Sequence, residues 1–126
     1  MNAQVLVVED NPANMKLFSI MLRKAGHEVL QAYTAEEAIA LARAHLPDLI
    51  LMDIQLPGMD GLAATRILKD DESTRRIPVV ALTALAMKGD EQRTIAAGCD
   101  GYIAKPIQYQ SFLEEVGRRL AGSPPP

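Results

Sequence analysis

Short apolar runs alternate with longer amphipathic stretches along the whole chain. The apolar runs predict β-strands at residues 5–8, around 29–30, and at 49–52, 79–82 and 101–104. Each run is followed by a stretch in which apolar residues recur at helical spacing. The runs at 5–8, 49–52 and 79–82 contain only apolar residues, which is typical of parallel strands buried on both faces.

Local signals predict where the helices begin and end. Asn11 is placed to cap the first helix, with Pro12 at its first position, and Thr34 begins a capping box before the second helix. Asp60 and Asp90 are the expected N-caps of the third and fourth helices. The second helix is expected to turn the following residues inward: Ala38, Leu41, Ala42 and Leu46.

Five strand–helix units with short connections predict a doubly wound α/β domain. We expect a five-stranded parallel sheet in the flavodoxin-like order 2-1-3-4-5, with helices on both faces. A chain of 126 residues suits a single domain. We expect that domain to cover residues 1–121, and residues 122–126 to be a tail or the start of a linker.

Composition excludes several classes of partner. A formal charge of −3 argues against binding a nucleic-acid backbone, and the absence of Trp argues against a base-stacking surface. Cys99 is the only cysteine, which excludes an internal disulfide and a thiolate metal cage. The apolar runs are too short to span a membrane, and the start of the chain lacks the basic segment of a signal peptide. These features predict a cytoplasmic protein without a direct nucleic-acid or membrane partner.

Polar side chains follow four of the predicted strands at the point where each ends. Glu9 and Asp10 follow the first strand, Asp53 the third, Thr83 the fourth and Lys105 the fifth. Ligands of such sheets bind outside the carboxyl ends of the strands, so these groups share one pocket if their strands are neighbours.

Carboxylates that meet in one pocket need a compensating positive charge. Two like charges ~4 Å apart repel by ~4 kcal/mol at an effective dielectric constant of ~20. A hard divalent cation removes this repulsion, and Mg²⁺ fits because it keeps several waters and needs only one or two carboxylates. Mn²⁺ is a possible substitute.

Other sites for nucleotides or hydrolysis lack their parts. The chain contains neither G-x-G-x-x-G nor G-x-x-x-x-G-K-[ST], and the loop after the first strand is acidic, so a dinucleotide, flavin or P-loop site is a poor fit. The two histidines, His27 and His45, fall on different predicted elements. This separation argues against a Ser-His-Asp triad or a zinc hydrolase.

Four stretches together resemble the receiver domain of two-component response regulators: residues 7–11, 51–61, 80–84 and 105–106. The resemblance covers roughly residues 3 to 120, and separated strand ends agree with the family in residue type and order. Residues 9–18 and 86–91 are most similar to the stand-alone receivers that regulate cell division.

The resemblance implies a phosphorylation site. Asp53 would be the phosphoacceptor, taking a phosphoryl group from a phosphohistidine donor. Mg²⁺ would be held by Asp10, Asp53 and the backbone carbonyl of Gln55, with Glu9 acting through water. Lys105 would neutralise charge on the phosphoryl group.

The resemblance also implies a switch. Thr83 would turn its hydroxyl toward the phosphoryl oxygens, and Tyr102 would fill the space that Thr83 leaves. Gln55 and Leu85 would flank the water that attacks the acyl phosphate. Because the apolar Leu85 cannot position that water by hydrogen bonding, we expect slow self-dephosphorylation.

The implied partners are proteins. The donor would be a histidine kinase or a histidine phosphotransfer protein, docked near the first helix and the loop after the third strand. A downstream protein target would bind a face formed by the fourth helix, fifth strand and fifth helix, including Met87, Tyr102, Ile107 and Tyr109. Beyond self-phosphorylation and self-dephosphorylation, the resemblance implies no enzyme activity.

Taken singly, the site residues have simpler interpretations. Asp10 and Asp53 could cap turns, Lys105 could be a solvated lysine, and Tyr102 could only pack. Among functions, a receiver module of a hybrid histidine kinase or a longer regulator remains an alternative. A magnesium-dependent phosphohydrolase of small molecules would need a general acid or base near Asp53, which Gln55 is not. A purely structural scaffold would be expected to lose Asp53 or Lys105, and both are present.

Overall fold

Strands and helices alternate from one end of the chain to the other. The computed structural model describes residues 3–83, 88–104 and 107–120, with the backbone alone at 88–91. In chain order the elements are β1 (Gln4–Val8), α1 (Pro12–Lys24), β2 (Glu28–Ala32), α2 (Ala35–His45), β3 (Leu49–Asp53), α3 (Gly61–Asp70), β4 (Val79–Thr83), α4 (Lys88–Ala96), β5 (Gly101–Ala104) and α5 (Tyr109–Leu120). Within the described residues, none of these helices combines the length and the apolar character that a membrane span requires.

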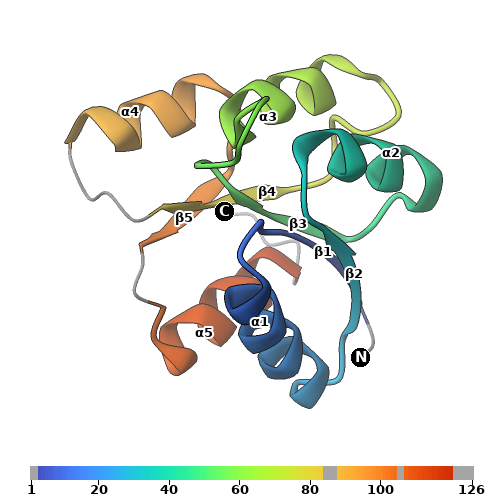
Figure 1. Ribbon diagram of the computed structural model, residues 1–126, viewed down its shortest axis with the longest axis vertical. Coiled ribbons are helices and arrows are strands. Elements are labelled where there is room, and N and C mark those ends of the chain that lie inside the picture. The colour runs from blue at the N-terminus through green and yellow to red at the C-terminus, as the bar shows by residue number, and fades with distance from the viewer. Residues whose placement is uncertain (1–2, 84–87, 105–106, 121–126) are drawn as a thin grey trace.

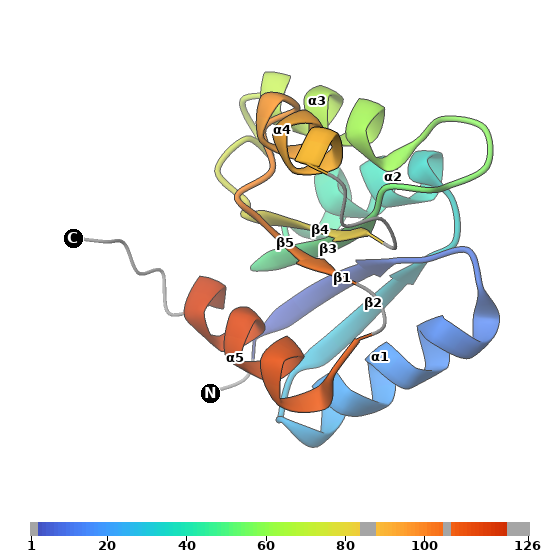
Figure 2. The same cartoon turned by 90° about the vertical axis from the view of Figure 1, so that its left-hand side faces the viewer.

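The strands form one parallel sheet in the order β2-β1-β3-β4-β5, which confirms the predicted fold class. Helices α1 and α5 lie on one face of the sheet, and α2, α3 and α4 lie on the other (Figure 1). The view turned by 90° shows the same two layers with the sheet between them (Figure 2).

The central strand β3 shows why the predicted strands are wholly apolar. Leu49 and Leu51 pack into the core on the α1 and α5 side, whereas Ile50 and Met52 pack into the core on the α2 and α3 side. All four side chains are fully buried. Burial of each contributes about 1.5–3 kcal/mol, so both layers of helices are held to the sheet by the same strand.

Helices α1 and α5 are joined by an aromatic contact. The rings of Phe18 and Phe112 stack with their centroids 5.7 Å apart, and both side chains are buried. The contact holds α5 against the first helix.

Three of the four predicted helix caps are confirmed. The side chain of Asn11 accepts hydrogen bonds from the first turn of α1, and Asp60 does the same for α3. Thr34 Oγ1 accepts the N–H of Glu37 at 3.1 Å. The returning bond of this capping box comes from the N–H of Tyr33, one residue before the cap, to Glu37 Oε1 at 2.7 Å.

Two local predictions are wrong. Helix α4 begins at Lys88, so Asp90 lies within the helix and is not its N-cap. Leu46 does not face inward; it follows the last turn of α2 with a left-handed backbone (φ 47°) and is 53% exposed. Because Pro47 comes next, the chain must leave the helix at this point, and the left-handed residue makes the turn.

Asp71, at the end of α3, ties two helices together. Its carboxylate accepts hydrogen bonds from the N–H and the hydroxyl of Ser73 at 2.9 and 2.8 Å, and from Arg43 Nε of α2 at 2.8 Å. The bonds from Ser73, aided by the Arg43 guanidinium, lower the pKa of Asp71 to about 2. These bonds therefore favour the charged form of the carboxylate in the folded protein.

Asp71 should make stability depend on pH in the acid range. Because its pKa is lower in the folded than in the unfolded chain, its contribution is complete above about pH 4 and disappears as the pH falls towards about 2. The difference in unfolding free energy between wild type and Asp71→Asn, measured by urea titration, should be constant near neutral pH and should shrink between about pH 4 and pH 3. A difference that grows on acidification would contradict this assignment.

Candidate functional site

The pairing register brings the polar strand ends to one level of the sheet. Val8 of β1 lies opposite Met52 of β3, so Glu9 follows its strand at the level of Asp53. Asp53 itself lies opposite Leu82 of β4. One residue further, Thr83 lies opposite Ala104 of β5. The predicted site residues of β1, β3 and β4 therefore share the same edge.

Three carboxylates meet at this edge. One carboxylate oxygen from each of Glu9, Asp10 and Asp53 lies within 4.8 Å of the other two. Glu9 is 1% exposed and Asp53 is 3% exposed, whereas Asp10 faces solvent. At this distance each pair of charges repels by about 3 kcal/mol at an effective dielectric constant of about 20, so the cluster requires positive charge close by.

Backbone amides hold two of the carboxylates in place. Glu9 Oε2 accepts the N–H of Asn11 at 3.1 Å, and Asn11 in turn caps α1. Asp53 Oδ1 accepts the N–H of Gln55 at 2.9 Å. The turns that follow β1 and β3 therefore fix the positions of the buried Glu9 and Asp53 carboxylates.

The donor set suits a hard metal ion. Carboxylate oxygens are the ligands that Mg²⁺, Mn²⁺ and Ca²⁺ prefer, and a partly exposed cluster leaves room for coordinated waters. The cluster of Glu9, Asp10 and Asp53 could therefore bind a metal ion, as the sequence predicted from the strand ends.

The two residues of the predicted switch lie on one face of the sheet. Tyr102 of β5 pairs with Ala81, two residues before Thr83 on β4, so both side chains project toward the α4 side. Thr83 is buried, at 2% exposure, whereas Tyr102 is 41% exposed. Three other predicted site residues, Leu85, Met87 and Lys105, lie outside the described residues, as does the predicted tail at 122–126.

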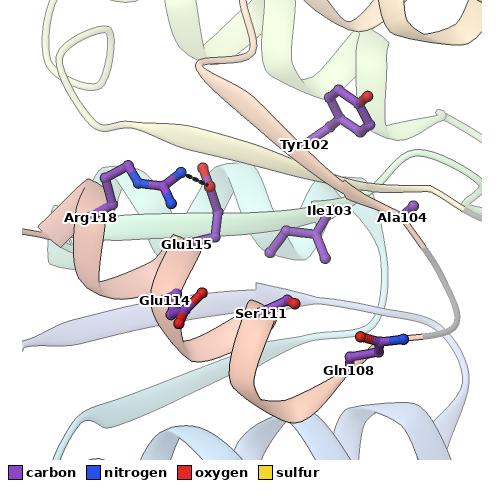
Figure 3. A pocket seen from close by; sticks show the side chains of 8 residues that line it. All are labelled: Tyr102, Ile103, Ala104, Gln108, Ser111, Glu114, Glu115 and Arg118. Atoms are coloured by element: carbon purple, nitrogen blue, oxygen red, sulfur yellow. Dashed lines mark hydrogen bonds and ion pairs between the residues drawn. The ribbon is translucent and has the colours of Figure 1, made fainter.

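A groove of about 580 Å³ runs between β5 and α5 (Figure 3). Its lining residues are Tyr102, Ile103 and Ala104 of β5, Gln108 just before α5, and Ser111, Glu114, Glu115 and Arg118 of α5. Glu115 is bound by Arg118 at 2.6 Å, as the figure shows, and by Arg119 at 2.8 Å.

The strand and helix that line this groove belong to the predicted partner face, and Tyr102 is the lining residue named in that prediction. Of the other predicted residues, Tyr109 is 51% exposed, and Ile107 is half-buried against the core on the α1 and α5 side. The polar residues Ser111 and Arg118 were not named individually, although their spacing of seven places them on one stripe of α5.

Taken together, the order of the strands and the acidic cluster at their carboxyl ends define a receiver-type α/β domain. The family model of the response regulator receiver domain matches residues 5–117. The chain therefore belongs to the response regulator receiver domain family, whose members are signalling switches that work with histidine kinases or phosphotransfer proteins.

Relatives with curated names point to one branch of that family. The chain is 53% identical to the polar-differentiation response regulator DivK of Brucella ovis over 116 residues, which cover 92% of this chain and 94% of the relative. The DivK protein of Brucella melitensis matches to the same extent. The chain is thus similar in sequence and in length to these DivK regulators.

Solved structures of response regulators and receiver domains have the same fold as this chain. A response regulator from Chloroflexus aurantiacus has a TM-score of 0.92 at 30% identity, covering 96% of this chain and 99% of its own. The receiver domain of a sensor histidine kinase from Pseudomonas aeruginosa has a TM-score of 0.88 at 38% identity, covering 98% of this chain and 100% of its own. That second structure holds a magnesium ion in its active-site cleft.

Removing one of the three charges should reveal whether the cluster binds Mg²⁺. In EDTA, Asp10→Asn should unfold at a higher temperature than wild type, because one repulsive pair of charges is lost with each neighbour. Added Mg²⁺ should raise the unfolding free energy of wild type by RT ln(1 + [Mg²⁺]/Kd), and its unfolding temperature with it. The same addition should raise the unfolding temperature of Asp10→Asn much less.

Glu72→Gln is the matched control, since Glu72 is an exposed acid in the loop after α3 and the substitution removes the same charge. Its Mg²⁺ response should equal that of wild type. An Asp10→Asn variant with the wild-type response would show that Asp10 takes no part in binding the ion.

Proposed function

We propose that Asp53 accepts a phosphoryl group from a phosphohistidine donor, with Mg²⁺ bound beside it, and that the resulting state is transmitted by protein–protein contacts. The observation that carries this proposal is the meeting of Glu9, Asp10 and Asp53 within 4.8 Å at the carboxyl edge of a receiver fold. Such a cluster offers both a nucleophilic oxygen and a place for the cation that a phosphoryl group needs.

The metal would be held by Asp10, Asp53 and the backbone carbonyl of Gln55, with Glu9 acting through water. The hydrogen bond from the N–H of Gln55 to Asp53 Oδ1 supports this set, because it keeps the two residues together. The magnesium ion in the related receiver domain from Pseudomonas aeruginosa supports the choice of metal. When bound, the ion would neutralise negative charge on the phosphoryl oxygens.

In the transfer, a carboxylate oxygen of Asp53 attacks the phosphorus of the phosphohistidine. An O–P bond forms, the P–N bond to the imidazole breaks, and the leaving nitrogen takes up a proton. The product on this chain is an acyl phosphate. Thr83, at the next level of the sheet, and Lys105 would bind the new phosphoryl oxygens, which supplies the positioning and neutralisation that phosphoryl transfer requires.

The donor would dock against α1 and the loop after β3. Helix α1 begins directly after the acidic loop and carries Leu17 and Ile20 on its exposed surface, 49% and 45% exposed. Two large apolar side chains one turn apart suit a helix of the donor, since paired helices bury such stripes. A histidine kinase or a histidine phosphotransfer protein would fill this role.

The output would leave through the face formed by α4, β5 and α5. Turning Thr83 toward the phosphoryl group would vacate space on the face that it shares with Tyr102, and the exposed ring of Tyr102 could then move inward. Phosphorylation would shift a pre-existing equilibrium between these arrangements. The ring lies on the α4 side of β5, so a downstream protein bound against this exposed surface would detect the phosphorylated state.

Residues 1–121 would form the receiver domain, and self-phosphorylation and self-dephosphorylation would be its only chemistry. A single, partly buried cysteine supports a reducing, cytoplasmic setting. The exposed Gln55 beside Asp53 is neither acid nor base, so no observation favours a hydrolase of separate substrates.

The phosphoacceptor can be tested with small phosphodonors. Incubation with acetyl phosphate and Mg²⁺ should add one phosphoryl group to wild type, visible by intact-protein mass spectrometry, and should add none to Asp53→Asn. Asp70→Asn, which changes an exposed acid at the end of α3, should be modified like wild type. Modification of Asp53→Asn at the wild-type rate would place the acceptor elsewhere and overturn the proposal.

The lifetime of the acyl phosphate depends on how well a water is held for attack. Because Leu85 offers no hydrogen bond to that water, Leu85→Asn should release phosphate faster than wild type, by several-fold. The measurement is a time course of phosphate release from the phosphorylated protein after the donor is removed. An unchanged rate would show that residue 85 does not limit hydrolysis.

A further inference from the structure

The first residue of α3 lies directly against the backbone of Asp53. A Cβ atom built on Gly61 would lie 2.2 Å from the carbonyl oxygen of Asp53, 2.8 Å from Cα of Ile54 and 2.9 Å from the carbonyl carbon of Asp53. Attractive contact between such atoms begins near 3.5 Å, so all three distances are strongly repulsive. All three atoms belong to the main chain, and none can rotate out of the way.

Gly61 cannot carry a side chain because there is no room for one, and not because of its backbone conformation. Gly61 does not have the positive φ that Gly26, Gly58 and Gly98 have, so alanine could adopt its backbone conformation. Gly61 is also buried. A substitution would therefore act by pushing apart two backbone segments, the start of α3 and the Asp53–Ile54 peptide.

Hydrogen bonds keep these segments together. The N–H of Gly61 donates to the carbonyl oxygen of Ile54 at 3.3 Å, and the N–H of Ile54 donates to the carbonyl oxygen of Leu82 at 3.2 Å. The peptide between Asp53 and Ile54 is thus held between α3 on one side and β4 on the other. Next to Gly61, the side chain of Leu62 packs in a buried cluster with Ile54.

We infer that Gly61 is a positioning residue for phosphoryl transfer: its missing side chain lets α3 press against the Asp53 peptide and so fixes where the Asp53 carboxylate and the Gln55 backbone lie. This inference rests on the proposed role of Asp53 as phosphoacceptor. The path to the site is short, because Asp53 Oδ1 accepts the N–H of Gln55 and both residues belong to the displaced segment. A displacement of about 1 Å at reacting groups can lower a rate about 100-fold.

The chain supplies a matched control for a glycine-to-alanine change. Gly117 lies within α5, and a Cβ atom there would meet nothing within 4 Å. Gly117→Ala should therefore leave the site unchanged, whereas Gly61→Ala should move it. Both variants add the same single methyl group.

The first experiment compares wild type, Gly61→Ala, Gly117→Ala and Asp53→Asn. The rate of phosphorylation at saturating acetyl phosphate should fall about 100-fold in Gly61→Ala and stay within twofold of wild type in Gly117→Ala. Mg²⁺ affinity, followed by amide NMR shifts without any phosphodonor, should fall at least tenfold in Gly61→Ala. The amide signal of Gln55 should be displaced in this variant even before Mg²⁺ is added.

A second pair of variants separates positioning from loss of stability, and it applies even if Gly61→Ala does not fold. Leu62→Ala loosens the end of α3 that presses on the Asp53 peptide, whereas Leu68→Ala removes the same atoms from a buried position at the other end of the helix. At a temperature where both variants are folded by circular dichroism, phosphorylation should be slowed about tenfold in Leu62→Ala and should be unchanged in Leu68→Ala.

The outcomes distinguish this inference from the proposed function. If wild type is not phosphorylated, or Asp53→Asn is phosphorylated equally, the proposed function fails. If wild type, Gly117→Ala and Asp53→Asn behave as expected but Gly61→Ala keeps the wild-type rate and Mg²⁺ affinity, the positioning role of Gly61 is overturned and the proposed function stands. Equal losses in Leu62→Ala and Leu68→Ala would likewise overturn it, because they would trace the effect to stability.

Discussion

Mutual repulsion of three carboxylates, held within 4.8 Å of one another, is the constraint on which the proposed function of this protein depends. The parallel sheet causes this repulsion, because its register places the ends of β1 and β3 side by side. Burial of Glu9 and Asp53 strengthens the repulsion between the carboxylates, since less water is present to screen their charges. In the proposed function the same arrangement becomes useful, because a bound divalent cation would neutralise the carboxylates and then the oxygens of the phosphoryl group. The acidic cluster is therefore a site that a bound cation would stabilise.

Such a site needs a rigid support, and the fold provides it from both faces. The buried side chains of β3 alternate between the two layers of helices, so the strand that ends in Asp53 is held from both sides. On the α2 and α3 side, the backbone of Gly61 is in contact with the Asp53–Ile54 peptide. On the other side, the cap of α1 and the amide of Asn11 fix Glu9. By contrast, Tyr102 stands exposed on the edge strand, where its ring can move without disturbing the core.

Much of this organisation could be predicted from the sequence. Hydrophobic periodicity and capping residues indicated the five strands and helices, and polar residues at the strand ends indicated the cluster, because the side-chain pattern of parallel strands is simple. The misplaced residues, Leu46 and Asp90, lie at helix ends, where one backbone torsion or one added turn decides the outcome. The contact between Gly61 and Asp53 could not be predicted, since it joins two backbone segments and leaves no side-chain signal. The groove along α5 also depends on how that helix lies against β5.

The central claim, that Glu9, Asp10 and Asp53 form one divalent metal site, can be tested most directly with Mn²⁺. Paramagnetic Mn²⁺ broadens the NMR signals of nearby amides, so substoichiometric Mn²⁺ should first broaden the signals of Asp10, Asp53 and Gln55, and excess Mg²⁺ should restore them. Amides beside exposed acids elsewhere, such as Glu36 and Glu72, should stay sharp at that concentration. Uniform broadening, or broadening that begins at those distant acids, would contradict the account.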